Sequence, residues 1–171
     1  MAKTTTDKFA NIAAIQVTEA VAGTLAYAKF NFPYSVMDKM ALLISRIEYL
    51  PLSISNLNSS TDNVVIALIA ASAIVDIGNQ ADPVLLDSTR LIRNDLGAAA
   101  TGALHQFPFV KDFSSLPGGG ILVAPSPLCA AIQSNGAAGV MNAWVKFFYT
   151  AVSLSTDEYW ELVESRRIIS T

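Results

Sequence analysis

The chain has 171 residues, of which 52% are hydrophobic and 15% charged, and its formal net charge is −3. This length suits one well-buried domain, and so few charges, against roughly 25% in ordinary soluble domains, indicate a surface hidden against partners. A single cysteine, Cys129, excludes an intrachain disulfide framework, and the lack of a basic arm or stripe argues against direct binding of nucleic acid.

Residues 1–23 are predicted to form an N-terminal arm or a first strand, and residues 24–171 a domain that ends in a helix. The chain opens with the polar run Met-Ala-Lys-Thr-Thr-Thr-Asp-Lys, which lacks the apolar core of a secretory signal. We therefore expect a protein that is made and folded in a reducing cytoplasm and is not secreted by a signal peptide.

Turn-forming residues recur at short spacing and separate short apolar runs, a pattern typical of an all-β sandwich or barrel. These turns stand at 31–33, 56–63, 78–83, 97–102, 117–120 and 135–139. Strands are predicted between them at 24–32, 63–72, 84–93, 120–124 and 129–133. The most apolar uncharged run, 63–75, is shorter than the about 20 residues that a membrane-spanning helix needs. No transmembrane segment is therefore expected.

Residues 36–50 fit two different elements. Their apolar residues recur at helical spacing, which favours a helix. A strand over 41–49 would place Leu43, Ile47 and Tyr49 on one face, and the β-branched residues and the closing Pro51 fit that assignment as well. Spacing alone favours the helix.

The last part of the chain predicts a strand and then a helix. Residues 144–152 have aromatic or β-branched side chains on both faces, which indicates a central strand buried on both sides, so Trp144 is assigned to the core. Ser155 and Glu158 form a capping box, and Asp157 adds a second negative charge to the first turn. A short C-terminal helix is therefore predicted at 156–165.

No catalytic, cofactor or metal site is predicted. His105 and Cys129 are too few ligands for a structural zinc site, and neither lies in a nucleophile motif. The glycines at 118–120 precede an apolar strand and not the Lys-Ser/Thr of a phosphate-binding loop. Ser126 lacks the flanking glycines of a nucleophile elbow. We expect a protein that is not an enzyme and needs no cofactor.

Three segments share a further pattern: Lys-Met-Ala-Leu-Leu-Ile-Ser-Arg-Ile-Glu-Tyr at 39–49, Leu-Pro-Gly-Gly-Gly-Ile-Leu-Val-Ala-Pro at 116–125, and Val-Lys-Phe-Phe-Tyr-Thr at 145–150 leading into 154–159. Over about residues 24–165 this order resembles the small jelly-roll major structural proteins of icosahedral bacterial and archaeal viruses. In such proteins an early strand, a Gly/Pro turn into the penultimate strand and a final aromatic strand carry these runs. The resemblance implies a single jelly-roll β-sandwich, and it favours a strand at 36–50.

The resemblance also implies a function. It points to a viral structural protein, a capsid subunit that self-assembles into an icosahedral shell and resides in the virion. Its partners would be copies of itself and other virion proteins. Because a basic N-terminal arm is missing, contact with the genome would be made elsewhere, through an internal membrane or another protein. We expect Gly118, Gly119, Gly120 and Trp160 to contribute assembly contacts.

Two other hypotheses stay open. A small-ligand or carbohydrate-binding β-sandwich would use exposed aromatic residues such as Trp144 or Trp160 as a platform, although Trp144 is better assigned to the core and Trp160 to a helix at an interface. An enzyme would have to rely on His105 or Cys129. A size measurement on the purified protein distinguishes a shell subunit from both.

Overall fold

The computed structural model describes residues 10–31, 38–59, 61–74, 76–79, 81–82, 84–93, 108–124 and 127–169, and only the backbone of residues 165–169. Within these ranges the chain forms nine β-strands and one α-helix. His105, Ser126 and the turn predicted at 97–102 lie outside the described residues.

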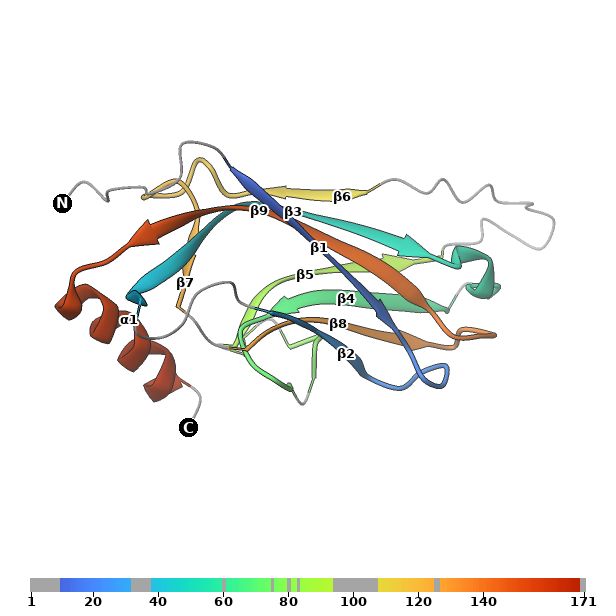
Figure 1. Cartoon of the computed structure of the whole chain (residues 1–171). Helices are drawn as coiled ribbons and strands as arrows, with labels where there is room; N and C mark the ends of the chain where they lie inside the picture. The colour runs from blue at the N-terminus through green and yellow to red at the C-terminus, as the bar shows by residue number, and fades with distance from the viewer. Residues whose placement is uncertain are drawn as a thin grey trace.

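Two antiparallel sheets lie face to face and form the two layers of a sandwich (Figure 1). The first sheet has the order β1 (Asn11–Thr18), β9 (Asn142–Ser153), β3 (Met40–Leu52) and β6 (Phe109–Asp112), and β7 (Ile121–Val123) also pairs with β3. The second sheet has the order β2 (Ala26–Phe30), β8 (Leu128–Asn135), β4 (Asn63–Ile69) and β5 (Leu85–Ile92). A 3₁₀ turn (Ile54–Asn56) follows β3, and α1 (Thr156–Ile169) follows β9 at one end of the sandwich.

The chain crosses between the sheets at almost every connection. β6 and β7 both pair antiparallel to β3 and together act as one interrupted strand. With that strand counted once, only β4 and β5 follow one another within a sheet, and β9 lies between β1 and β3. This order is that of a jelly roll, in which two four-stranded sheets are built from Greek keys. The predicted all-β single jelly-roll β-sandwich with a short C-terminal helix is confirmed.

The main core fills the space between the two sheets and follows the two-residue period of the strands. In β1, Ala13, Ile15 and Val17 point inward and are buried, whereas Ile12 points outward. Across the core, Phe30 of β2 meets Phe147 of β9 edge to face, with ring centroids 5.1 Å apart. Such aromatic pairs add to the apolar burial that holds the layers together.

Parts of the outward sides of the sheets are covered as well. On the second sheet, Ile74 and Ile77 pack against β4 and β8. The Tyr27 hydroxyl ties this cover down, because it donates to the Ile74 carbonyl (2.6 Å) and accepts from the Ile74 N–H (3.2 Å). On the first sheet, Tyr159 of α1 packs over Val152 near the end of β9.

The ambiguous segment at 36–50 contributes a strand and not a helix, since β3 runs through the middle of the first sheet. A β-bulge between Ile44 and Arg46 shifts its alternation by one residue. As a result Ile47 and Tyr49 face the main core, but Leu43 faces α1, so the predicted common face was wrong at Leu43. The bulge also explains the misleading spacing, because it breaks the two-residue period within the run.

The strand predicted at 144–152 is central, as expected, but it is not buried on both sides throughout. Val152 is fully buried beneath α1, whereas Trp144 is 38% exposed on the outward side. The assignment of Trp144 to the core was therefore wrong. The helix covers only the far end of the sheet, and a strand's sequence does not reveal how far such a cover extends.

The remaining predicted elements are found with shifted ends. β2, β4, β5, β7 and β8 lie at the predicted strands, β1 lies within the predicted arm or first strand, and β6 was not predicted. The helix begins where predicted and continues to Ile169. Its capping box is formed, because the Ser155 N–H donates to Glu158 Oε2 (3.0 Å) and the Glu158 N–H donates to Ser155 Oγ (3.3 Å). The division of the chain at residue 23 stays a prediction.

Candidate functional site

The outward side of the first sheet carries a cluster of aromatic and charged side chains from β3 and β9. Phe148 lies between two cations, with the Arg46 guanidinium carbon 5.3 Å and Lys146 Nζ 4.8 Å from its ring centroid. Glu48 Oε1 lies 2.6 Å from Arg46 Nη2, and Glu48 Oε2 lies 3.4 Å from Lys146 Nζ. The ion pairs and cation–π contacts join the four side chains into one network on the surface of the sheet.

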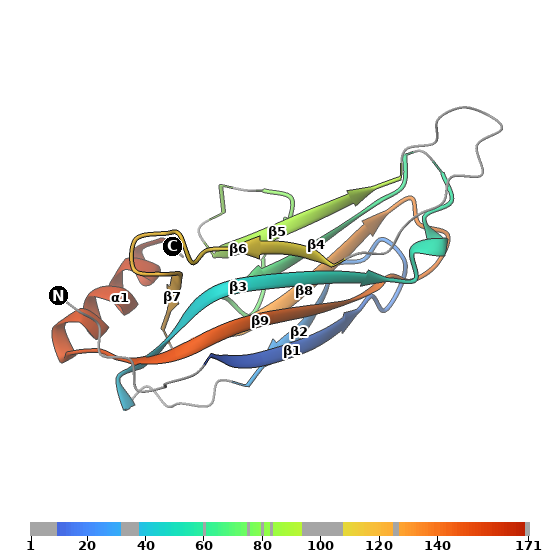
Figure 2. The same ribbon diagram turned by 90° about the horizontal axis from the view of Figure 1, so that it is seen from above.

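Apolar side chains surround this cluster. In the strand register Ile12 lies opposite Phe148, and Val110 lies opposite Glu48. Ile12, Val110 and Trp144 are 58%, 46% and 38% exposed, although they stand on three different strands. Figure 2 looks onto this side of the sheet, with β6, β3, β9 and β1 side by side. We call this surface the outer face; its members are Ile12, Arg46, Glu48, Val110, Trp144, Lys146 and Phe148.

The glycines expected to make assembly contacts lie in the loop 113–120, which joins β6 to β7. Both ends of the loop contact β3 beside its bulge. At the start of the loop the Phe113 N–H donates to the Ser45 carbonyl (2.7 Å), and at its end Gly120 lies against the Ile44 backbone. The exposed apolar side chains of the loop include Leu116, which is 45% exposed. The role of Gly118, Gly119 and Gly120 in assembly stays a prediction.

Trp160 stands on α1, as predicted, and is 53% exposed. Its ring meets the edge of the buried Tyr159 ring, with centroids 5.9 Å apart. Leu122 of β7 packs into the same cluster as Tyr159, so the loop 113–120 and α1 lie at the same end of the sandwich (Figures 1 and 2). The structure thus brings the predicted assembly contacts to one end, and their role stays a prediction.

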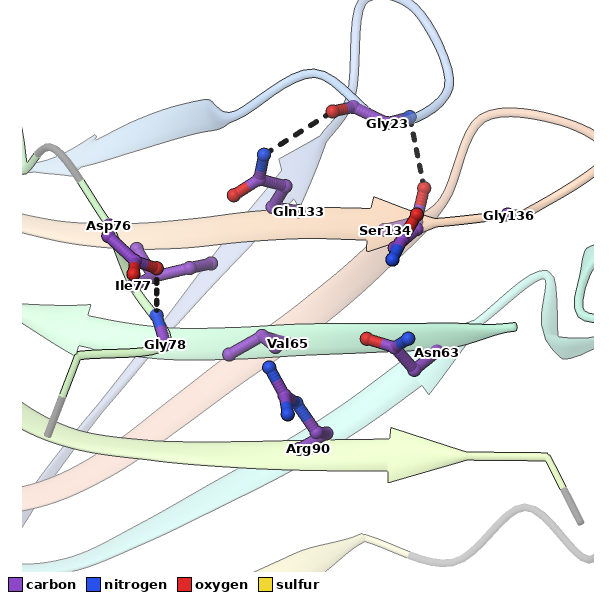
Figure 3. Close-up of a pocket in the computed structure, with 11 residues that line it drawn as sticks. Gly23, Asn63, Val65, Asp76, Ile77, Gly78, Arg90, Gln133, Ser134 and Gly136 are labelled. Carbon is purple, nitrogen blue, oxygen red and sulfur yellow. Dashed lines mark hydrogen bonds between the residues drawn. The ribbon is translucent and has the colours of Figure 1, made fainter. Parts of the chain in front are cut away.

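A pocket of about 300 Å³ opens on the outward side of the second sheet (Figure 3). Its walls come from β4, β5 and the end of β8, from the turn at Gly23 and from residues 76–78. The lining residues are mostly polar: Gly23, Asn63, Val65, Asp76, Ile77, Gly78, Arg90, Gln133, Ser134, Asn135 and Gly136. No aromatic side chain belongs to this described lining.

A buried carboxylate fixes one wall of this pocket. Glu19 is 3% exposed and accepts hydrogen bonds from the Ser134 N–H, from the Ser134 hydroxyl (2.9 Å) and from the Met141 N–H (2.9 Å). The Ser134 hydroxyl in turn accepts from the Gly23 N–H (3.1 Å). Glu19 therefore joins the end of β1 to β8 and to the β8–β9 loop, and it holds the Gly23 turn in place.

A second acidic group lies between the sheets. Asp87 of β5 is half-buried near Tyr49 of β3, and Tyr49 Oη and Asp87 Oδ2 both lack a partner at regular hydrogen-bonding geometry among the described residues. Burial raises the pKa of Asp87, and the Tyr49 hydroxyl and the Lys111 ammonium of β6 offset only part of that rise. Burial, and then the charge of Asp87, raise the pKa of Tyr49 well above its usual value.

Asp87→Asn is expected to raise the melting temperature at neutral pH by a few degrees. Because the pKa of Asp87 is higher in the folded chain, folding favours its protonated form. The stabilisation from Asp87 is therefore fully present below a pH of about 3.9, the pKa of this carboxyl in the unfolded chain. It is lost as the pH rises through the higher pKa of the folded chain. The variant should lack this fall, which thermal unfolding across acidic to neutral pH would measure.

Asp112→Asn is the matched control for that prediction. The Ser114 N–H donates to Asp112 Oδ1 (2.8 Å), and hydrogen bonding from Ser114 lowers the pKa of Asp112. The stabilisation from Asp112 is present above the pKa that this carboxyl has in the unfolded chain, and it is lost as the pH falls through the lower pKa of the folded chain. Its pH dependence is therefore opposite in sign to that of Asp87. Equal pH profiles for the wild type and Asp87→Asn would contradict the assignment of the fall to Asp87.

The residues considered for chemistry do not form a site in the described part of the chain. Cys129 is 2% exposed, and burial raises the pKa of its thiol, which disfavours the reactive thiolate. Glu19 and Asp87 were missed by the sequence analysis. Glu19 continues the inward series of Ala13, Ile15 and Val17 by one more step of two, so this period could have placed it in the interior.

The comparisons with known proteins show the fold of the chain. No protein-family model matches the sequence, and no curated protein matches it. Among solved structures, VP1 of Merkel cell polyomavirus, as an unassembled pentamer, is similar with a TM-score of 0.52 and 6% identity, over 91% of this chain and 99% of that one.

Two further structures align less well. VP1 of chimpanzee polyomavirus has a TM-score of 0.46 and 8% identity, over 91% of this chain and 99% of that one. A chain of Bacillus endospore appendages, described as disulfide-linked pili, has a TM-score of 0.35 and 11% identity, over 88% and 96%. No helix in the described part of the present chain is long and apolar enough to span a membrane.

Proposed function

We propose that the chain is a structural subunit that assembles with copies of itself into the shell of a virion. The observation that carries this proposal is the outer face, where Ile12, Val110 and Trp144 are exposed on a sheet whose other side is the core. Exposed apolar side chains that gather on one face of a protein indicate a contact region. A second copy is the commonest partner for such a surface, since most oligomers are homomeric.

The character of the outer face supports a protein interface over a membrane or nucleic-acid surface. Both of its cations contact Glu48, and Asp112 of β6 stands opposite Arg46 in the strand register, so two carboxylates balance the two cations and leave no excess of positive charge for phosphate groups. Its aromatic members, Trp144 and Phe148, and its Arg46 are residue types that are enriched at protein interfaces. The fold supports the same conclusion, since VP1 of Merkel cell polyomavirus, a viral protein solved as an unassembled pentamer, is similar in fold.

The finer parts of the proposal follow from the same surfaces. The shell would be icosahedral, with subunit contacts through the outer face and through the end that holds the loop 113–120 and Trp160. Other virion proteins would take part, and contact with the genome would be made through one of them or through an internal membrane. The subunit would have no catalytic activity, and its location would be the virion.

The purified protein is expected to sediment as large or ordered oligomers, and Trp144→Glu is expected to reduce them to small species. A carboxylate in place of Trp144 on the outer face would lose its hydration in the contact, which costs several kcal/mol. Trp160→Glu should weaken assembly as well, through the helix end. Analytical ultracentrifugation across protein and salt concentrations measures both effects.

Val21→Glu is the matched control, since it places the same charge at an apolar residue that is 63% exposed in the β1–β2 turn, away from both surfaces. Its sedimentation should equal that of the wild type. A wild-type protein that stays monomeric at every concentration tested would refute the shell proposal, because the exposed apolar surface would then have no partner copy.

A ligand module whose aromatic platform combines both tryptophans lacks support, and a platform built on either one alone stays a hypothesis. Trp144 stands near the start of β9 and Trp160 on the helix beyond its end, so roughly 30 Å of strand separates them at about 3.3 Å per residue. The two indole rings therefore cannot form one platform.

A further inference from the structure

The pocket on the second sheet contains several polar groups that have no partner among the described residues. The Arg90 guanidinium makes no hydrogen bond or ion pair with the described residues, and it stands on the outward side of β5 next to the cavity (Figure 3). Asn63 donates its amide to the Thr61 carbonyl (3.2 Å), and Gln133 donates its amide to the Gly23 carbonyl (3.4 Å). Both side-chain carbonyl oxygens are therefore left as acceptors.

The pocket is also built in advance of any ligand. Ile77 is 1% exposed and packs with Val65 in the apolar cover of the sheet, so these two side chains form a fixed apolar floor. Asp76 Oδ1 accepts from the Gly78 N–H (2.7 Å), which fixes the turn, and Oδ2 has no hydrogen-bond partner among the described residues. The opposite wall is held by Glu19 through Ser134. A preformed cavity loses little entropy on binding.

The charges of the lining narrow the class of ligand. Arg90 is its one cation and Asp76 its one carboxylate among the described lining residues, so the two formal charges cancel. An anionic ligand, such as a phosphate or a carboxylate, would be repelled by the Asp76 carboxylate. A cationic amine would be repelled by the Arg90 guanidinium. A hydroxyl group both donates and accepts, so it can satisfy the guanidinium and the amide oxygens alike.

The size and the floor narrow the class further. About 300 Å³ is at the small end of the cavities in which proteins bind small molecules, and it suits one ring and not an extended chain. An apolar floor with a polar rim matches a ring with an apolar face and hydroxyl groups at its edge. We propose that this pocket binds a neutral polyhydroxylated ring, such as a single sugar residue at the end of a glycan. This site is independent of the proposed assembly surfaces.

The test uses the full chain and saturation-transfer NMR, which detects weak ligands of large particles. The probes are the methyl glycosides of glucose, galactose and mannose and N-acetylglucosamine, with methyl phosphate and butylamine as the charged classes, and all of them carry C–H protons for detection. At least one neutral sugar should give saturation transfer that a second sugar competes away. Arg90→Ala should weaken this binding roughly tenfold, as expected for the loss of a hydrogen bond from a charged donor.

Two variants complete the test. A Cβ at Gly78 would lie 3.5 Å from Arg90 Nη2 and 3.0 Å from Asp76 Oδ1, so Gly78→Ala narrows the pocket and should reduce sugar binding severalfold. Lys29→Ala removes an exposed cation on the same sheet outside the lining and should change nothing. The proposal is overturned if no sugar binds, or if methyl phosphate or butylamine binds better than every sugar. It is also overturned if Arg90→Ala and Gly78→Ala bind the sugar as the wild type does, once thermal unfolding has shown that both variants are folded.

Discussion

Glu19→Ala is expected to lower the free energy of unfolding by about 3–5 kcal/mol, because it leaves three buried donors without their acceptor. Those donors are the N–H groups of Ser134 and Met141 and the Ser134 hydroxyl, all of which now meet the Glu19 carboxylate. The site is nearly closed to solvent, with Glu19 at 3% and Ser134 at 2% exposure, so water cannot readily replace the carboxylate. Urea unfolding followed by tryptophan fluorescence measures the loss.

Two further substitutions show whether the effect comes from hydrogen bonding. Glu19→Gln keeps the shape of the side chain and one acceptor oxygen, but it points an amide N–H at the donors of Ser134 and Met141. About half of the stability lost in Glu19→Ala should therefore be lost in Glu19→Gln as well. Glu161→Ala removes a carboxylate from the exposed side of α1 and should stay within about 0.5 kcal/mol of the wild type. If Glu19→Ala were as mild as Glu161→Ala, the network would not support the end of the sandwich.

Gly120→Ala is expected to destabilise the fold by about 3 kcal/mol through overpacking against β3. A Cβ at this position would lie 2.4 Å from the Ile44 carbonyl oxygen and 2.9 Å from the Ile44 carbonyl carbon. These are backbone atoms of a central strand next to its bulge, so they cannot move aside as a flexible side chain would. The melting temperature of the purified variant reports the effect.

Gly119→Ala separates that contact from the general cost of losing a glycine. Gly119 has a φ of 79° and nothing within 4 Å of a Cβ position, so alanine should cost only about 1 kcal/mol of backbone strain. The difference between the two variants isolates the close approach to Ile44. Equal losses would show that the contact with β3 carries no weight. The assembly of Gly119→Ala also tests the predicted contact role of the glycine run without unfolding the subunit.

Much of the architecture could be predicted from the sequence because short-range patterns determine it. The capping box of Ser155 and Glu158 locates the start of α1, and alternation and turn residues locate β2, β4, β5, β7 and β8. The strand β6 was missed, since four residues are too few to show a period. The bulge beside Ile44 likewise disguised β3, because one extra residue breaks the alternation that identifies a strand.

The candidate sites were harder to predict because they depend on which strands become neighbours. Ile12, Val110 and Trp144 stand far apart in the sequence, and only the order β1, β9, β3 and β6 places them on one surface. Arg90 and Gln133 meet at the pocket for the same reason, since β4 lies between β5 and β8. Even the correct strands do not show which outward side a helix or loop will cover, and this is why Trp144 was wrongly assigned to the core.

The position of β9 has a consequence for how the chain is made. Its partners in the first sheet, β1 and β3, are synthesised well before it, yet they do not pair with each other. Until residues 142–153 have left the ribosome, β1 has no strand of its sheet to pair with, and β3 can pair only with β6 and β7. Such long-range pairing slows folding and exposes unfinished chains to aggregation. In a cell translating many copies at once, the yield of folded subunit should therefore depend strongly on chaperone supply and on the temperature of expression.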